Sequence, residues 1–219
     1  LATTDLTHHG KNYNNTELDH PVQMSKIIDE EELIQGMLIN DVNIIKKRED
    51  LMCGRYAILF FAKIMKILNL RGSILEYYDS SQLEDKYVIR PEPVDNNFVS
   101  YVSLFYDSKN NELLTDFEIN FALGMLKSNI IKTVNGGTYK LRFPTWHKFT
   151  KMKNGVFVGT SLNGDTNCSY GRYQTNKSSA ENIINASNQC IDDASGRWRN
   201  PYTKENIDLM KYKIEILDD

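Results

Sequence analysis

One cysteine and one histidine are the residues of this chain whose types and positions suggest chemistry. Cys53 follows Asp50, which can act as the N-cap of a long apolar helix, so we expect Cys53 in the first helical turn. The free amides and the helix dipole stabilise a thiolate at that place. His147 is the one histidine outside the N-terminal segment, and it heads a predicted β hairpin that ends at Asn163 and Asp165. A thiolate, an imidazole base and a side chain that orients the imidazole together make the active site of a nucleophilic hydrolase.

In layout, this order is similar to that of papain-like cysteine proteases, including the short viral leader proteases. The resemblance implies a thiol hydrolase with Cys53 as the nucleophile, His147 as the base and Asp165 or Asn163 as the residue that orients the imidazole. The family also has an amide side chain shortly before the cysteine, where this chain has residues 47–50, Lys-Arg-Glu-Asp. On a helical wheel Cys53 falls on the apolar side, which favours a packed core cysteine.

The two other cysteines are candidates for a disulfide. Cys168 and Cys190 flank one strand-to-helix segment, and they can pair if the compartment is oxidising. The chain has no Cys-x-x-Cys pair, so neither a zinc site nor a thioredoxin-type site is predicted. His8, His9 and His20 lie in a polar segment and are expected to be solvated. We therefore expect no metal and no cofactor.

Two short segments place arginine beside an aromatic residue, an arrangement that can bind a ligand or a partner. Arg172 precedes Tyr173, and Arg197 precedes Trp198. Such pairs can stack on bases or sugars, although an arginine that packs on a surface aromatic gives the same pattern. The net charge of −3 is small and the basic residues are scattered, which argues against binding of nucleic acid mainly through charge. The expected partner is a protein.

The composition is that of an ordinary globular protein. A chain of 219 residues can bury a sizeable core, so it needs no disulfide or metal to fold. No run of 18 apolar residues occurs, so no transmembrane span is predicted from the sequence. Because the chain begins at Leu1 rather than Met, an exported or otherwise processed form is one expectation, and the compartment stays open.

Helices are predicted first along the chain. Residues 1–24 are polar and lack periodicity, which predicts an extended arm that a partner orders. A capping-box pattern at residues 29–32 predicts the start of a first helix. Residues 51–70 are apolar nearly all round and predict a second helix that ends at Gly72. A helix of this kind is packed on more than one side, so we expect it to be central.

The rest of the chain has the pattern of an antiparallel sheet. Asn154-Gly155 and Asn163-Gly164 predict turns, and Ser178 with Glu181 predicts a capping box. The predicted strands cover 87–90, 98–106, 113–119, 138–143, 146–152, 156–162 and 210–216, and the predicted helices cover 121–134 and 180–193.

This order of elements predicts an α+β fold: N-terminal helices with one central apolar helix packed against a mainly antiparallel sheet. It indicates one domain over residues 25–219, helical over 25–72 and mainly β with two helices over 73–219.

The favoured functional interpretation is a non-enzymatic interaction or assembly protein that acts through protein–protein contacts, with a protein partner or as an oligomer. Three features favour it: the polar arm, the Tyr, Trp and Arg residues in the second half, and the lack of a complete catalytic motif. The alternative is the papain-like thiol hydrolase that would use Cys53 and His147.

Overall fold

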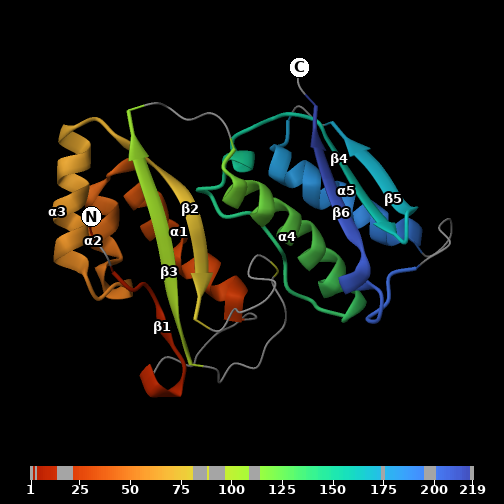
Figure 1. Cartoon of the computed structure of the whole chain (residues 1–219), viewed down its shortest axis with the longest axis horizontal. Helices are drawn as coiled ribbons and strands as arrows, with labels where there is room; N and C mark the ends of the chain where they lie inside the picture. The colour runs from red at the N-terminus through yellow and green to blue at the C-terminus, as the bar shows by residue number, and fades with distance from the viewer. Residues whose placement is uncertain are drawn as a thin grey trace. The chain divides into compact units, whose positions relative to one another are not determined.

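The chain forms two compact units in a computed structural model. The model describes residues 2, 4–13, 22–80, 88, 97–108, 114–173, 176–194 and 201–217, with only the backbone described for 22–29 and 193–194. Unit 1 consists of Leu1–Lys86, Pro91–Asn120 and Pro144–Trp146, and unit 2 of Tyr87–Arg90, Phe121–Phe143 and His147–Asp219. Each unit contains helices and antiparallel strands, which confirms the α+β class (Figure 1). The sequence pattern indicates one domain and does not predict this division into two units.

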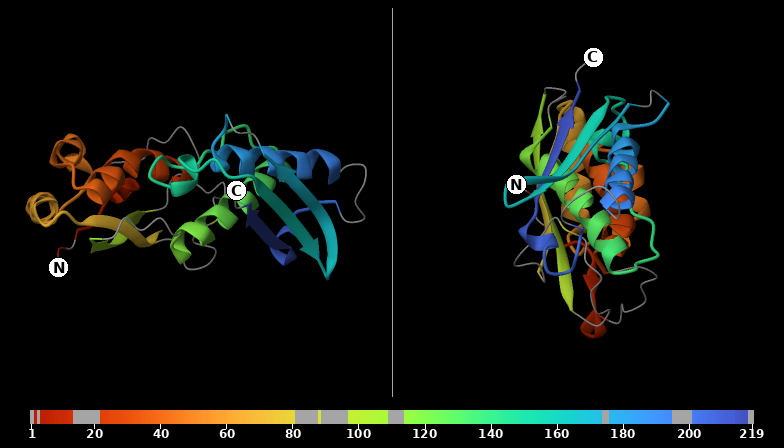
Figure 2. Two further views of the ribbon diagram at one scale, coloured as in Figure 1. Left: turned by 90° about the horizontal axis from the view of Figure 1, so that it is seen from above. Right: turned by 90° about the vertical axis from the view of Figure 1, so that its right-hand side faces the viewer.

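Unit 1 combines helices with a small antiparallel sheet. Its described elements are β1 (His8–His9), η1 (Lys11–Tyr13), α1 (Val22–Ile39), α2 (Val42–Lys47), η2 (Glu49–Leu51), α3 (Arg55–Ile67), β2 (Arg71–Asp79) and β3 (Phe98–Asp107). The strand order is β1-β3-β2. The helix α1 packs against β2 and α2, and α2 packs against α3 (Figure 2). Leu33 and Ile34 of α1 are buried in the core of this unit, together with Ile74 of β2 and Phe98 of β3.

Unit 2 places a helix against a second antiparallel sheet. Its described elements are most of α4 (Asp116–Val134), η3 (Lys148–Thr150), β4 (Val156–Leu162), β5 (Asp165–Arg172), α5 (Ser179–Ala194), η4 (Ile207–Leu209) and β6 (Lys211–Ile216). The strand order is β5-β4-β6, and α5 packs against β4 and β5. Asn163 and Gly164 have φ angles of 54° and 91°, so they form the tight turn between β4 and β5 that the sequence predicts.

Local hydrogen bonds cap the starts of two helices, and the second of these starts, at Ser178, is predicted from the sequence. The Asp41 carboxylate accepts from the backbone N–H groups of Asn43 and Ile44 and caps α2. Before α5, the backbone N–H of Ser178 donates to Glu181 Oε2 (2.9 Å), and the N–H of Glu181 donates to Ser178 Oγ (3.3 Å). The hydrogen bond from the Ser178 backbone is the main reason that the pKa of Glu181 lies below its ordinary value.

Other helix boundaries differ from the prediction, because the residue patterns that mark helix ends also occur inside helices and strands. The helix α1 begins at Val22, so Asp29 and Glu32 lie within it rather than at its start. Asn69, with a φ of 54°, follows the end of α3 in the left-handed conformation, so the helix ends there rather than at Gly72. Gly72 lies in β2 instead, where an added Cβ would be about 3.1 Å from the Leu38 backbone.

Three predicted strands are wrong where the structure describes them. Residues 138–143 are not in a strand, although Leu141 and Phe143 are buried in alternation with exposed neighbours. Residues 146–152 form a turn and η3, and α4 already begins at Asp116 within the predicted strand 113–119. Alternation reports which side chains are buried, whereas a strand also needs a neighbour to pair with. The predicted strand 87–90 lies outside the described residues, apart from Val88.

The apolar helix is shorter and less enclosed than predicted. It is α3, and it spans Arg55–Ile67 rather than 51–70. Its buried residues are Ile58, Leu59 and Ala62. The predicted central position is not confirmed, because much of the apolar surface of α3 is exposed within its own unit. High hydrophobicity all round a helix therefore does not ensure that the chain itself covers every side.

The described part of the predicted N-terminal arm packs on unit 1. Leu6 is fully buried, and its N–H donates to the Ser100 carbonyl (3.0 Å), while the Ser100 N–H donates to the Thr7 carbonyl (3.0 Å). The Thr7 N–H also donates to Oε1 of the buried Glu30 (2.9 Å), and the Tyr77 hydroxyl donates to Glu30 Oε2. These contacts join the first residues to α1, β2 and β3, so the described part of the arm is ordered by its own unit.

Glu30 gives unit 1 a specific pH dependence. Burial raises the pKa of its carboxyl, and hydrogen bonds from Thr7, Tyr77 and Ser100 offset only part of the increase. Between the unfolded-state pKa and this raised value, the folded chain binds more protons than the unfolded chain. The contribution of Glu30 to the free energy of unfolding is therefore largest at low pH and is lost as the pH rises through the folded-state pKa.

We expect the E30Q variant to lose this decline with rising pH, since a glutamine does not titrate. Urea unfolding of the wild type and the variant between pH 4.5 and pH 8 measures the difference. The control is E32Q, at an exposed position on the same helix, which should follow the wild type. Parallel pH profiles for wild type and E30Q would contradict the assignment.

Candidate functional site

Cys53 is exposed and precedes the helix instead of lying in its first turn. Met52 is extended and buried, which separates η2 from α3, and Gly54 then occupies the N-cap position of α3. The predicted cap at Asp50 is therefore wrong, and so is the prediction that Cys53 is packed in the core. Cys53 Sγ lies 3.8 Å from Thr4 Oγ1, and the Gly54 N–H donates to the same oxygen (2.8 Å).

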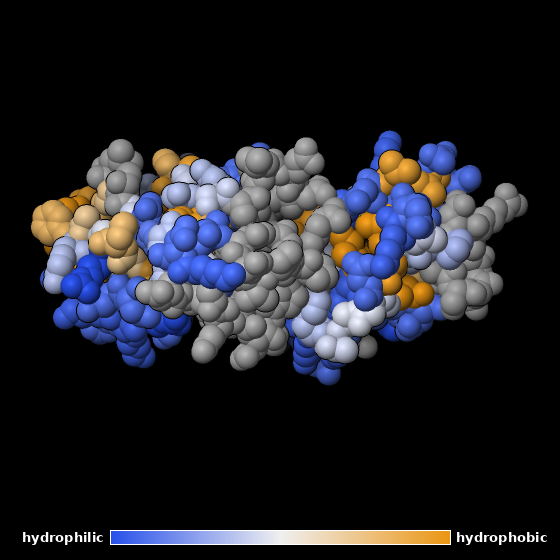
Figure 3. All heavy atoms as spheres, turned by 90° about the horizontal axis from the view of Figure 1, so that it is seen from below, coloured by the Kyte–Doolittle hydropathy of each residue, from blue (hydrophilic) through white to orange (hydrophobic). Residues whose placement is uncertain are grey.

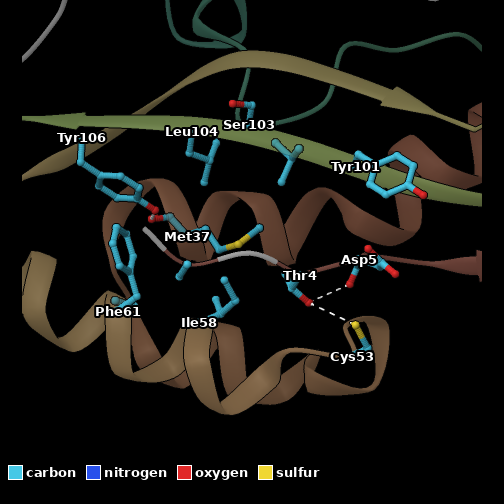
Figure 4. Close-up of a pocket in the computed structure, with 13 residues that line it drawn as sticks. Thr4, Asp5, Met37, Cys53, Ile58, Phe61, Tyr101, Ser103, Leu104 and Tyr106 are labelled. Carbon is cyan, nitrogen blue, oxygen red and sulfur yellow. Dashed lines mark hydrogen bonds between the residues drawn. The ribbon is translucent and has the colours of Figure 1, made fainter.

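A pocket of about 520 Å³ lies beside this thiol, within unit 1. Its walls come from the first residues of the chain, from α1, from α3 and from β3 (Figure 4). The apolar part is lined by Met37, Ile58, Phe61, Ala62, Val102, Leu104 and Tyr106. The volume and the mainly apolar lining are typical of small-molecule sites, which range from about 300 to 1,000 Å³.

The polar groups of the pocket gather toward the Cys53 end. Thr4 and Asp5 lie there, and Tyr101 of β3 also lines the pocket (Figure 4). Burial, and after it the negative charge of Asp5, raises the pKa of the Tyr101 hydroxyl. His8 Nε2 lies 3.8 Å from Asp5 Oδ2. No histidine is among the described residues that line this pocket.

His147, the predicted base, is a fully buried residue of unit 2. Its ring centroid lies 5.0 Å from those of Phe143 and Phe149 and 5.6 Å from that of Phe121. Its Nδ1 accepts from the Phe149 N–H (3.2 Å) and so caps η3. These contacts are those of a packing and capping residue. The predicted nucleophile, Cys53, belongs to the other unit, unit 1.

The other predicted site residues lie on the β4–β5 hairpin or outside the described residues. Asn163 and Asp165 are exposed at its turn. Arg172 lies at the far end of β5, and the neighbouring Tyr173 is exposed. Asn163 and Asp165 therefore lie at the opposite end of the hairpin from Arg172. The predicted pair Arg197 and Trp198 lies outside the described residues.

The cysteines of unit 2 are bonded to each other. Cys168 on β5 and Cys190 on α5 form a disulfide across 22 residues of sequence, and both are fully buried. The bond ties the helix to the sheet that it packs against. Since all three cysteines of the chain lie in the described residues, Cys53 is its one free thiol.

The outer face of α3 carries large apolar side chains in water. Tyr56, Phe60, Lys63 and Ile67 recur at the spacing that places them on one face of a helix. The exposed fractions are 74% for Tyr56, 67% for Phe60 and 82% for Ile67. Hydrophobic residues are visible on the surface at the end of unit 1 where α3 lies (Figure 3). The same spacing is present in the sequence, where it predicts one side of a buried helix.

No known protein family matches the chain, and no curated protein matches it. In the described part of the chain, no three His, Cys, Asp or Glu side chains gather where they could hold a metal ion. Among the described helices, none has the length and hydrophobicity to cross a bilayer. The candidate sites are therefore the pocket beside Cys53 and the outer face of α3.

Proposed function

We propose that this protein is a non-enzymatic interaction or assembly protein that acts through protein–protein contacts, with the outer face of α3 as its contact surface. The observation that carries the proposal is the exposure of Tyr56, Phe60 and Ile67 along one helix face. Single exposed apolar residues are common, but large ones that gather on a surface mark interaction sites. Aromatic residues at such a surface are typical of the positions that contribute most to binding.

The charge of this face indicates the chemistry of the partner. Lys63 lies within the apolar stripe, and Arg55 and Lys66 are exposed beside it. The helix itself contains no acidic residue. A complementary partner is an amphipathic helix whose apolar stripe is bordered by Asp and Glu, since α3 extends for about 20 Å and helices pack along their ridges. A second copy of the same face would bring like charges together, which disfavours a symmetric dimer through α3.

An anionic lipid surface is the competing occupant, because exposed aromatic and basic residues on a helix also suit a membrane interface. Two features favour the protein partner. Glu49 and Asp50 lie in η2, the short helix that precedes α3, where they would repel anionic headgroups. The apolar side chains form a narrow stripe, and a stripe matches one helix better than a broad lipid surface.

The proposal is tested with the full chain and a fluorescent synthetic helix of about 20 residues, long enough to be helical, with a leucine stripe bordered by glutamates. We expect F60E to weaken binding of this peptide about 30-fold, the loss expected for an anchor residue worth about 2 kcal/mol. The matched control is F105E, at an exposed phenylalanine of β3, which should change binding less than about twofold. Fluorescence anisotropy gives both dissociation constants.

Equal losses in F60E and F105E would contradict α3 as the contact surface, and so would unchanged binding in F60E. Anionic vesicles supply the second arm of the experiment. Binding of the wild type to phosphatidylserine vesicles that is lost in F60E would identify a lipid surface as the occupant instead.

A thiol hydrolase is the second candidate function, because Cys53 is exposed beside a pocket. Cys53 would be the nucleophile, with His147 as the base and Asp165 or Asn163 as the orienting residue. The full burial of His147 among phenylalanine rings opposes this assignment, since a general base must reach the proton that it accepts. The two roles of His147 make different predictions for the alkylation of Cys53.

A further inference from the structure

The pocket beside Cys53 combines an apolar interior with one charged side chain. Ile58 and Phe61 enter it from α3, and Leu104 and Tyr106 enter it from β3 (Figure 4). The side chains of Phe61 and Tyr106 meet edge to face, with ring centroids 5.3 Å apart, and they bound the apolar part. A ligand body in this space must be apolar, because these side chains offer it few hydrogen bonds.

The polar end of the pocket offers acceptors and a negative charge. The Asp5 carboxylate is half exposed there, and Thr4 Oγ1 already donates to the Asp5 carbonyl (2.9 Å). Arg55, the first residue of α3, is the basic residue nearest to Cys53 in the sequence. Its guanidinium carbon lies 5.0 Å from the Tyr56 ring centroid, so its charge is not directed at the pocket. His8 is the other titratable group against Asp5, at 3.8 Å. A ligand head beside Asp5 and Tyr101 is therefore complementary if it carries a positive charge.

We propose that this pocket binds a small amphipathic amine, with the apolar body between α3 and β3 and the protonated amine beside Asp5. The site lies on the inner side of α3, between α3 and β3, so it is distinct from the outer face proposed to contact a protein. Cys53 takes no chemical part in binding, but its position at the polar end makes it a reporter of occupancy.

Alkylation of Cys53 tests the proposal in the full chain, since the other two cysteines are bonded to each other. The rate of reaction with iodoacetamide is measured at pH 8 with dodecylamine, dodecanol or dodecanoate below their aggregation concentrations. We expect dodecylamine to slow the reaction at the lowest concentration, dodecanol to need about tenfold more, and dodecanoate to need more still. Equal potency of dodecylamine and dodecanoate would overturn the assigned charge of the head group.

Three variants locate the ligand. D5N should raise the dodecylamine concentration that gives half protection about tenfold and leave that of dodecanol unchanged. L104W fills the apolar part and should remove protection by all three compounds, whereas F105W, on the neighbouring exposed residue of β3, should retain it.

The outcomes of these variants separate this proposal from the α3 contact surface. Unchanged potency in D5N, or the same loss in L104W and F105W, would overturn the pocket as an amine site. F60E should leave dodecylamine protection intact, so failure of the peptide experiment does not affect this one.

Discussion

Replacing both Cys168 and Cys190 with alanine is expected to lower the free energy of unfolding of unit 2 by about 2–5 kcal/mol. The disulfide closes a loop across 22 residues of sequence and joins α5 to β5 in the core of the unit. Without it the unfolded chain gains conformational freedom, and the helix loses its covalent link to the sheet. Alanine avoids burying a hydroxyl, so the loss reports the bond rather than a new polar group.

Hydrogen exchange of the α5 amides measures this loss locally, which matters because a chain of two units need not unfold in one step. C53A is the matched control, because the same substitution at the exposed thiol should change the free energy of unfolding by less than about 0.5 kcal/mol. Exchange of α5 that is as slow in the double variant as in C53A would show that the bond does not stabilise unit 2.

Replacing His147 with alanine is expected to cost about 2–5 kcal/mol, the range for large-to-small substitutions in a packed core. The imidazole is fully buried against Phe143 and Phe149, and its Nδ1 accepts the Phe149 N–H. H147N keeps an acceptor for that N–H and should recover part of the loss, since asparagine is a good capping residue. Urea unfolding of the full chain ranks the two variants.

The same variants test the hydrolase assignment through Cys53. If His147 only packs and caps, H147N should leave the rate of Cys53 alkylation by iodoacetamide at pH 6 unchanged. If His147 instead shares the proton of the thiol, H147N should slow that reaction at least about tenfold, because the thiolate is the reactive form. A slower reaction in a folded H147N variant would favour the thiol hydrolase over the interaction protein.

The parts of the fold that could be predicted are those whose signals are local. Asn163-Gly164 supplies the positive φ angles that a tight hairpin needs, and Ser178 with Glu181 satisfies the first amides of α5. Alternation over residues 211–216 identifies β6. Strand β2 was missed because its apolar residues are interrupted by Glu76, and pairing with β3 holds it in place. Such pairing is a long-range property, and local patterns do not report it.

The candidate sites were harder to predict, because contact between distant segments creates them. The pocket brings Asp5, Cys53 and Tyr101 together from three separate parts of the chain, with no common spacing that would indicate it. The outer face of α3 has the opposite difficulty. Tyr56, Phe60 and Ile67 have a clear helical spacing, but hydrophobicity does not tell whether the same chain or another molecule covers them.

A charge-reversal experiment on α3 tests the proposed function most directly. Two peptides of equal length and equal leucine stripe are compared, one bordered by glutamate and one by lysine, against the wild type and a K63E/K66E variant. Both lysines are exposed on α3, so the reversal should preserve the fold. We expect the wild type to prefer the acidic peptide at least about tenfold and the variant to reverse this preference. The same preference in both proteins would contradict α3 as the contact surface.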